Sequence, residues 1–127
     1  MSQLAINFTD SPSEHRVREL FLAAQDVQAR AYAPYSHFLV GAAILTSTGN
    51  TYVGCNVENA AYPVGSCAEA GAIAAMVAGG DTEIAVLVTI CDSAEVGTCC
   101  GGCRQRVREF AKSDTPIYAC GPDGIRA

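Results

Sequence analysis

Two short segments contain the residues best suited to chemistry. The first holds Cys67 and, two positions later, Glu69, and the second holds Cys100 and Cys103 in a Cys-x-x-Cys spacing. Three thiolates can bind a zinc ion and leave the fourth tetrahedral position open for water, as in catalytic zinc sites. A carboxylate close to such a water can carry its protons. The pattern therefore predicts a catalytic zinc site with Glu69 as general acid and base.

A structural zinc, or a thiol-redox module without catalysis, is the alternative interpretation of these cysteines. Structural sites normally have four Cys or His ligands. Cys99 is the candidate fourth ligand, because His15 and His37 are the only histidines and neither has ligand spacing. This alternative predicts four sulfur ligands and no activity to lose when Glu69 is replaced.

The 127 residues are expected to form a single domain, residues 1–127, with residues 1–12 as a loose lead-in. An odd number of cysteines, seven, in a chain that begins without a signal-like segment argues against a disulfide framework. We therefore expect Cys55, Cys91 and Cys120 to be small buried side chains. No apolar run reaches the roughly 18 residues that span a bilayer, so we expect no membrane association and a cytoplasmic location.

The formal net charge of −5 bears on the class of substrate. Proteins that bind DNA or RNA gather lysine and arginine to neutralise phosphates. The closest approach to such a cluster is Arg104, Arg106 and Arg108, which we expect on a solvated helix face. The charge therefore favours a small neutral substrate and argues against a deaminase of polynucleotides.

The first half of the chain is predicted to form a helix and a β-hairpin. Ser13 can cap a helix that starts near Glu14, apolar residues then recur at spacings of three and four, and Pro34 limits its end. Residues 38–46 and the segment from Thr51 are rich in β-branched and small residues on either side of a turn signal. This pattern is typical of two paired strands.

The second half alternates helices and strands. Residues 68–78 are apolar on every side, which predicts a buried helix, and residues 84–91 form a continuous apolar run, which predicts a strand covered on both faces. A helix opening at Gly102 or Cys103 and a strand over 116–120 follow. This order of elements predicts a three-layer α/β/α sandwich with a mixed sheet.

Sequence blocks beyond the cysteines make a family resemblance specific. Cys-Ala-Glu at 67–69 followed by Cys-x-x-Cys-Arg-Gln at 100–105 resembles the zinc-dependent cytidine deaminase family of the small homotetrameric type. Further matching blocks are YAPYSHF at 32–38, VGAA at 40–43 and GCNVENAAY at 54–62. The resemblance covers most of the chain, from about residue 31 to residue 120, and implies a cytidine deaminase-like fold.

This resemblance implies hydrolytic deamination of cytidine or deoxycytidine to uridine or deoxyuridine, with release of ammonia, as in pyrimidine salvage. One zinc ion per subunit, held by Cys67, Cys100 and Cys103, would activate the water that attacks C4 of the ring, and Glu69 would pass protons to the ring nitrogen and the departing amine. The resemblance also implies a homotetramer whose subunits share active sites. The family's substrate-binding positions correspond to Phe38, Asn56, Glu58, Ala60, Tyr62 and Ala68.

Each of these positions has an implied role. Asn56 and Glu58 share one face of an extended segment, and the family's matching pair holds the ribose hydroxyls. Residues 60–62 match a segment that family tetramers lend to a neighbour's site, Phe38 matches an aromatic packed on the substrate, and Ala68 matches backbone contacts to the pyrimidine. An exposed strand end for the polar pair and a core position for Phe38 are the alternative interpretations.

Three departures from the family pattern loosen the substrate assignment. Family members usually have an arginine after Cys-Ala-Glu that offsets the negative charge of three thiolates on Zn²⁺; this chain has Ala70, and Arg104 is the candidate replacement. Cys99 stands where proline is usual, and the chain stops at Ala127, short of an element that carries a further aromatic. The alternative function is therefore a related deaminase of a modified nucleoside or a blasticidin S-like cytosine compound.

Overall fold

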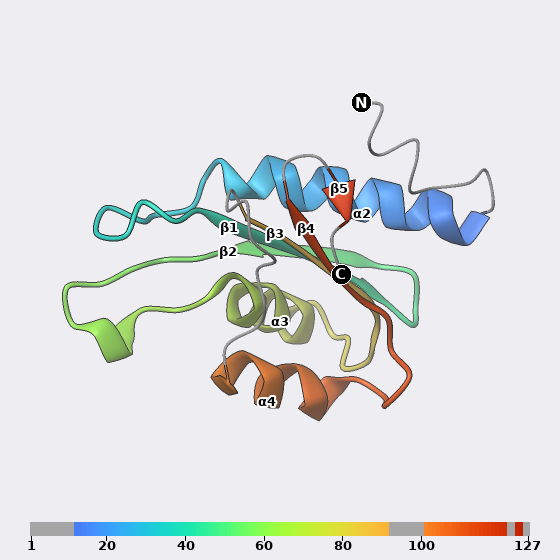
Figure 1. The fold of residues 1–127 in the computed structure, drawn as a ribbon. Helices are drawn as coiled ribbons and strands as arrows, with labels where there is room; N and C mark the ends of the chain where they lie inside the picture. The colour runs from blue at the N-terminus through green and yellow to red at the C-terminus, as the bar shows by residue number, and fades with distance from the viewer. Residues whose placement is uncertain (1–11, 92–100, 122–123, 126–127) are drawn as a thin grey trace.

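The computed structural model describes residues 12–91, 101–121 and 124–125. A five-stranded mixed sheet, in the order β2-β1-β3-β4-β5, lies between one layer formed by α2 and another formed by α3 and α4 (Figure 1). The predicted three-layer α/β/α sandwich is confirmed. The elements are α2 (Pro12–Gln28), β1 (Val40–Thr46), β2 (Thr51–Cys55), the 3₁₀-helix η1 (Tyr62–Val64), α3 (Ala68–Ala78), β3 (Ile84–Cys91), α4 (Gly101–Phe110), β4 (Ile117–Gly121) and β5 (Gly124–Ile125).

Helix α2 buries the predicted apolar stripe against the sheet. Leu20, Phe21 and Ala24 are almost fully buried and form one core cluster with side chains from β1, β3 and β4. The helix begins at Pro12, two residues before the predicted start, so Ser13 lies within the helix and the prediction that Ser13 caps it is wrong. The fixed φ of proline suits the first turn of a helix, which accounts for the earlier start.

Strands β1 and β2 form the predicted antiparallel hairpin, with pairs from Gly41↔Cys55 to Leu45↔Thr51. Glycines let the helices approach this hairpin closely. A Cβ at Gly41 would collide with the backbone oxygen of Ala24 in α2, and a Cβ at Gly54 would collide with the backbone of α3. The two helical layers are therefore held at short range around the hairpin.

Strand β3 lies at the centre of the sheet, antiparallel to β1 and parallel to β4. Its side chains alternate between the layers: Val88 and Ile90 pack on the α2 side, and Leu87 packs on the side of α3 and α4. Strand β5, which was not predicted, pairs with the end of β4 through Cys120↔Ile125.

Helix α3 has the predicted bounds but not the predicted burial. Ala72, Ile73 and Met76 are buried, whereas Ala74 and Val77 are exposed. The prediction of a helix buried on every side is therefore wrong, because the sheet and α4 cover only part of its surface. No helix in the described part of the chain is long and apolar enough to cross a membrane.

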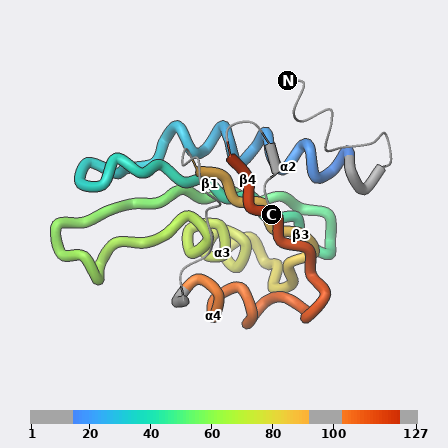
Figure 2. The backbone as a smooth tube through the Cα atoms, viewed as in Figure 1, coloured from blue at the N-terminus to red at the C-terminus, as the bar shows by residue number. Residues whose placement is uncertain are grey.

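Two connections extend side by side from one end of the sheet, residues 29–39 and residues 56–67 (Figure 2). A single β-bridge between Tyr32 and Val57 ties them together, and a second bridge, between Val57 and Ser66, lies within the second connection. The N-terminus of α3 follows the second connection directly. The candidate site residues are therefore gathered at this end of the sheet.

Candidate active site

Helix N-termini position both described cysteines of the predicted metal site. Cys67 is the N-cap residue of α3, and Cys103 lies in the first turn of α4, which packs against α3. The partial positive charge at the start of a helix stabilises a thiolate. Cys103 is 1% exposed and Cys67 is half-buried, so the site is reached from the side of Cys67.

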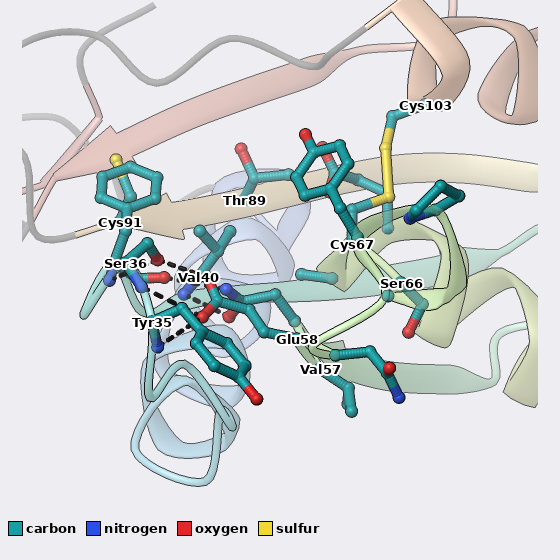
Figure 3. A pocket seen from close by; sticks show the side chains of 18 of the residues that line it. Tyr35, Ser36, Val40, Val57, Glu58, Ser66, Cys67, Thr89, Cys91 and Cys103 are labelled. Carbon is teal, nitrogen blue, oxygen red and sulfur yellow. Dashed lines mark hydrogen bonds between the residues drawn. A yellow bond between two sulfur atoms is a disulfide. The ribbon is translucent and has the colours of Figure 1, made fainter.

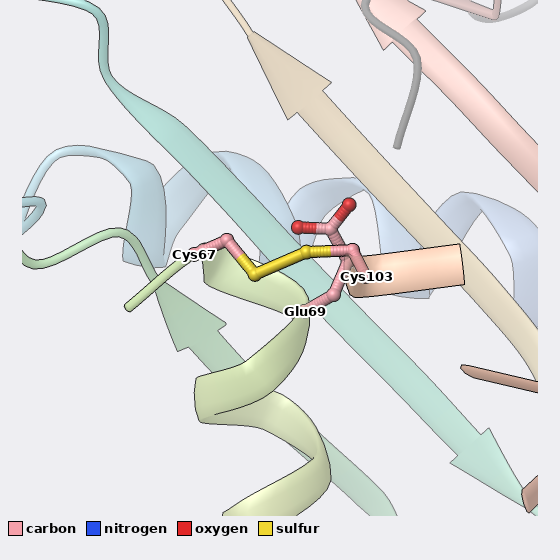
Figure 4. Close-up of side chains that lie close together, drawn as sticks. All are labelled: Cys67, Glu69 and Cys103. Carbon is pink, nitrogen blue, oxygen red and sulfur yellow. A yellow bond between two sulfur atoms is a disulfide. The ribbon is translucent and has the colours of Figure 1, made fainter. Parts of the chain in front are cut away.

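The two sulfurs lie together and are joined as a disulfide (Figure 4). The Cα atoms of Cys67 and Cys103 are 7.4 Å apart, which exceeds the roughly 4.4–6.8 Å usual for disulfides. Two thiolates that bind the same zinc ion, each at a zinc–sulfur distance of about 2.3 Å, suit this separation of the Cα atoms. Binding of the metal requires both sulfurs as free thiolates, so the zinc-loaded form is the reduced form.

Glu69 is the third member of this cluster. Its carboxylate oxygen and the two cysteine sulfurs all lie within 4.8 Å of one another, and Figure 4 shows the three side chains converging. The residue is 6% exposed and belongs to the first turn of α3, where the helix dipole favours a negative charge. A sulfur-rich donor set with an adjacent buried carboxylate fits zinc.

A cavity of about 780 Å³ opens onto this cluster (Figure 3). Its volume lies within the range of small-molecule sites. Cys67, Glu69 and Cys103 line it. So do all the predicted substrate-binding residues, namely Phe38, Asn56, Glu58, Ala60, Tyr62 and Ala68. The structure therefore brings Glu69, two of the predicted zinc ligands and the predicted substrate-binding residues together around one cavity.

Glu58 is held by the connection that precedes β1. Its Oε1 accepts hydrogen bonds from the backbone N–H groups of Tyr35 and Ser36, at 3.0 and 3.1 Å, and its Oε2 accepts one from the Ser36 hydroxyl (Figure 3). The Ser36 hydroxyl and then these N–H groups lower the pKa of the carboxyl group, so Glu58 is an anion at neutral pH. The sequence contained no direct signal for this contact.

Asn56 is anchored to the end of the same connection and to the first residue of β1. Its Oδ1 accepts a hydrogen bond from the Val40 N–H at 2.9 Å, and its Nδ2 donates to the Phe38 carbonyl at 2.8 Å. The amide oxygen keeps one further acceptor position for a ligand, and the amide nitrogen keeps one further N–H donor. Phe38 is 42% exposed, so the alternative of a core position for Phe38 is wrong.

Ala60 and Tyr62 lie at the outer part of the cavity in their own chain. Tyr62 begins the 3₁₀-helix η1 and is 91% exposed. The isolated chain thus leaves one of its largest apolar side chains in solvent beside the site.

Arg106 contacts the candidate metal site, although the sequence analysis singled out Arg104. Nη1 of Arg106 lies 3.7 Å from Sγ of Cys67, and Arg106 lines the cavity. Arg104 is exposed on α4, and its role beside the metal stays a prediction. Arg106 follows Cys103 by three positions, and this helical spacing is the signal that could have identified it.

The other cysteines differ in their burial. Cys99 and Cys100 lie outside the described residues. Cys91 and Cys120 are buried, as predicted, whereas Cys55 is half-buried. Burial raises the pKa of the Cys120 thiol to about 12, with a smaller effect of Cys91. Cys91 also lines the cavity together with Thr89, and the sequence analysis assigned neither residue to the site.

Comparison with known proteins places this geometry in a family. Residues 15–119 match the family described as "Cytidine and deoxycytidylate deaminase zinc-binding region". The chain belongs to this family. Zinc is accordingly its cofactor, in agreement with the Cys67–Glu69–Cys103 cluster.

Individual members of the family are similar over most of the chain. The cytidine deaminase of Sporosarcina psychrophila is 38% identical over 102 residues, 80% of this chain and 75% of that protein. The probable cytidine deaminase of Dictyostelium discoideum is 41% identical over 102 residues, 80% of this chain and 68% of that protein. The crystal structure of cytidine deaminase from Burkholderia pseudomallei has a TM-score of 0.81 at 35% identity and covers 86% of this chain and 88% of that chain.

Proposed function

We propose that this protein hydrolyses the exocyclic amine of free cytidine or deoxycytidine, giving uridine or deoxyuridine and ammonia. The observation that carries the proposal is the buried Glu69 carboxylate beside Cys67 and Cys103 at the wall of an open cavity. Several family members with this fold are named cytidine deaminases, which supports the same reaction.

Three cysteines would hold the zinc ion. Cys67 and Cys103 are two of the ligands, and Cys100, outside the described residues, is the third ligand predicted from the sequence. Zinc, when bound, supplies the Lewis acid that makes water a nucleophile near neutral pH. The two helix N-termini stabilise the thiolates, and the cavity admits the ring to them.

Glu69 would carry the protons of the reaction. Its carboxylate accepts a proton from the attacking water and passes it to the ring nitrogen, and it then accepts the second proton from the new C4 hydroxyl and donates it to the departing amine. The atoms balance, because one water molecule is consumed and one ammonia is released. Burial of Glu69 excludes bulk water from this exchange.

Recognition of the nucleoside would use the residues that surround the cavity. Asn56 and Glu58 are fixed by hydrogen bonds and suit the ribose hydroxyls, since Glu58 is an acceptor and the amide of Asn56 can donate. Phe38 offers an exposed ring for packing against the substrate, and Ala68 offers its backbone to the pyrimidine.

The proposal is tested by ultraviolet-monitored deamination of cytidine and deoxycytidine with zinc-loaded protein. Glu69→Gln keeps the size and removes the proton carrier, and we expect turnover to fall by about 10³-fold, within the range for general acid–base catalysis, while the zinc content stays at one ion per chain. Blasticidin S is the comparison substrate, and its turnover without turnover of cytidine would redirect the proposal to the related deaminase. Equal turnover by wild type and Glu69→Gln would overturn the role of Glu69.

The oligomer is a second part of this proposal. We propose a homotetramer with active sites shared between subunits, and we place the reaction in cytoplasmic pyrimidine salvage because the substrate is a free nucleoside. The support is the exposed apolar surface beside the cavity, with Tyr62 at 91% and Val64 at 68% exposure. Light scattering on the purified protein tests the assembly, and a monomer with full activity would contradict shared sites.

A further inference from the structure

Arg106 of α4 contacts Cys67, which lies at the start of the neighbouring helix α3. Arg106 and Cys103 are three positions apart, so both side chains lie along one face of α4. Arg106 Nη1 is 3.7 Å from Cys67 Sγ at the N-cap of α3. Arg106 therefore spans the two helices that bring Cys67 and Cys103 together.

The charges of the described residues explain what a cation would do there. Two thiolates already cancel the charge of Zn²⁺, and the Glu69 carboxylate within 4.8 Å of both sulfurs adds a further negative charge. Cys100, if it also binds, makes the cluster more negative. A sulfur with this surplus charge is a strong hydrogen-bond acceptor, and charge-assisted hydrogen bonds are the strong ones.

We propose that Arg106 is a positioning residue of the zinc centre, which donates a hydrogen bond to the Cys67 thiolate and offsets the negative charge of the thiolate cluster. Ala70, in the first turn of α3, has no group that can do this. Arginine suits the task because it stays charged and offers five donors without competing for the metal. The inference rests on the proposed zinc site but goes beyond it, because it assigns a residue to which the family resemblance gives no role.

The proposal predicts a loss of metal affinity when the charge is removed. Residues that hydrogen-bond metal ligands typically contribute about 10–100-fold to metal affinity or activity. We expect Arg106→Gln to weaken zinc binding by about 10-fold or more, and Arg106→Lys to recover part of this loss because it restores the charge without the planar guanidinium.

The experiment measures zinc affinity by competition with a chromophoric chelator, in reduced wild-type protein and in four variants. Arg106→Gln and Arg106→Lys test the proposal, Arg104→Gln tests the rival assignment, and Arg108→Gln is the matched control from the same helix. A second readout is the thiolate-to-metal absorption of the Co²⁺-loaded proteins, which reports directly on the sulfurs. Circular dichroism of the metal-free proteins shows whether each variant folds.

The expected result is a lower zinc affinity and a shifted Co²⁺ spectrum in Arg106→Gln, partial recovery in Arg106→Lys, and wild-type values in Arg108→Gln. Wild-type affinity and an unchanged spectrum in Arg106→Gln would overturn the proposal, as would the same loss in Arg104→Gln alone. If Arg106→Gln does not fold, the zinc affinities of Arg106→Lys and Arg108→Gln are compared. A lower affinity in Arg106→Lys supports the proposal, and equal wild-type affinities overturn it. Wild-type protein that binds zinc through its cysteines without deaminating cytidine would sink the proposed function and leave this test intact.

Discussion

The two ends of the sheet each contain a carboxylate held by hydrogen bonds, and one of them, Glu58, lines the cavity of the candidate site. Asp81, next to the β1–β2 turn, is 8% exposed and accepts hydrogen bonds from Thr48, Asn50 and Tyr52 at 2.7–2.9 Å. Glu58, at the other end, is half-buried, and two of its three described donors are backbone N–H groups.

Hydrogen bonds to a carboxylate therefore serve two purposes in this fold. At Asp81 three side chains converge on the carboxylate and fasten the hairpin turn to the segment after α3. At Glu58 the backbone of the neighbouring connection supplies the donors, which leaves part of the carboxylate facing the cavity for a ligand. We therefore expect substitutions at the Asp81 end to change stability and substitutions at the Glu58 end to change function.

The largest effect is expected when the metal site is broken. Cys67→Ala removes one thiolate, so the remaining ligands hold zinc weakly. Turnover of cytidine should fall by about 10³-fold or more, because the activated water is lost. Zinc content by mass spectrometry and turnover are measured together, with Cys55→Ala as the matched control. Full activity with one zinc ion per chain in Cys67→Ala would contradict the assignment.

A smaller effect is expected when Glu58 loses its hydroxyl donor. Ser36→Ala leaves the two backbone N–H contacts but frees one carboxylate oxygen. A hydrogen bond to a charged group contributes about 1.5–3 kcal/mol. Because the two backbone N–H groups still hold Glu58 in this variant, we expect only part of that contribution to be lost. KM for cytidine should then rise about 10-fold, with kcat unchanged. Thr48→Val is the matched control at Asp81 and should leave KM as it is. A rise in KM in both variants would show that substrate binding does not depend specifically on the contacts of Glu58.

The opposite outcome is expected at the other end. Asp81→Asn replaces an acceptor of three hydrogen bonds with an amide that cannot accept all of them. We expect Tm to fall by about 5 °C while KM and kcat stay within about twofold. Calorimetry and steady-state kinetics provide the two measurements. A large loss of activity at wild-type Tm would show that this cluster serves the site.

The smallest predicted effect is the pH dependence of the stability that Asp81 contributes. Hydrogen bonds from Thr48, then Asn50 and Tyr52, hold the pKa of Asp81 below its ordinary value of 3.8. The unfolded chain therefore binds a proton more readily, so this stabilisation is present above about pH 4 and is lost as the pH falls through the folded pKa. The Tm difference between wild type and Asp81→Asn should shrink between pH 6 and pH 3. A constant difference across that range would count against the mechanism.

The sequence predicted the layers well because apolar spacing depends on local geometry. The bounds of α3 and β3 matched, since each is an almost continuous apolar run ended by turn residues or a change of composition. The exposure of Val77 was missed, because the pattern of a helix does not tell which neighbours cover it.

The site was predicted in its chemistry but not in its contacts. The cysteines and Glu69 follow from spacing and resemblance, whereas the Glu58–Ser36 contact depends on how the preceding connection turns back. That turn uses His37 at a φ of 60°, a left-handed conformation that is uncommon for residues other than glycine, although asparagine, aspartate and histidine adopt it more often than the rest. The Arg106 contact depends in the same way on where α4 begins and how it packs on α3, which spacing alone does not determine.

The separation of Cys67 from Cys103 by 36 positions has a consequence for how the protein folds. The two sulfurs meet only when α3 and α4 are packed on the same face, and α4 connects β3 to its parallel partner β4. Parallel pairing of distant segments is slow compared with closing a hairpin, so the metal site should be completed late. Zinc then binds the finished fold in preference to earlier states, and at 100 times its dissociation constant it would add about 2.7 kcal/mol to the free energy of unfolding. The cofactor thus acts as a selective stabiliser of correctly assembled chains, a link that chelator-dependent shifts in the unfolding rate would measure.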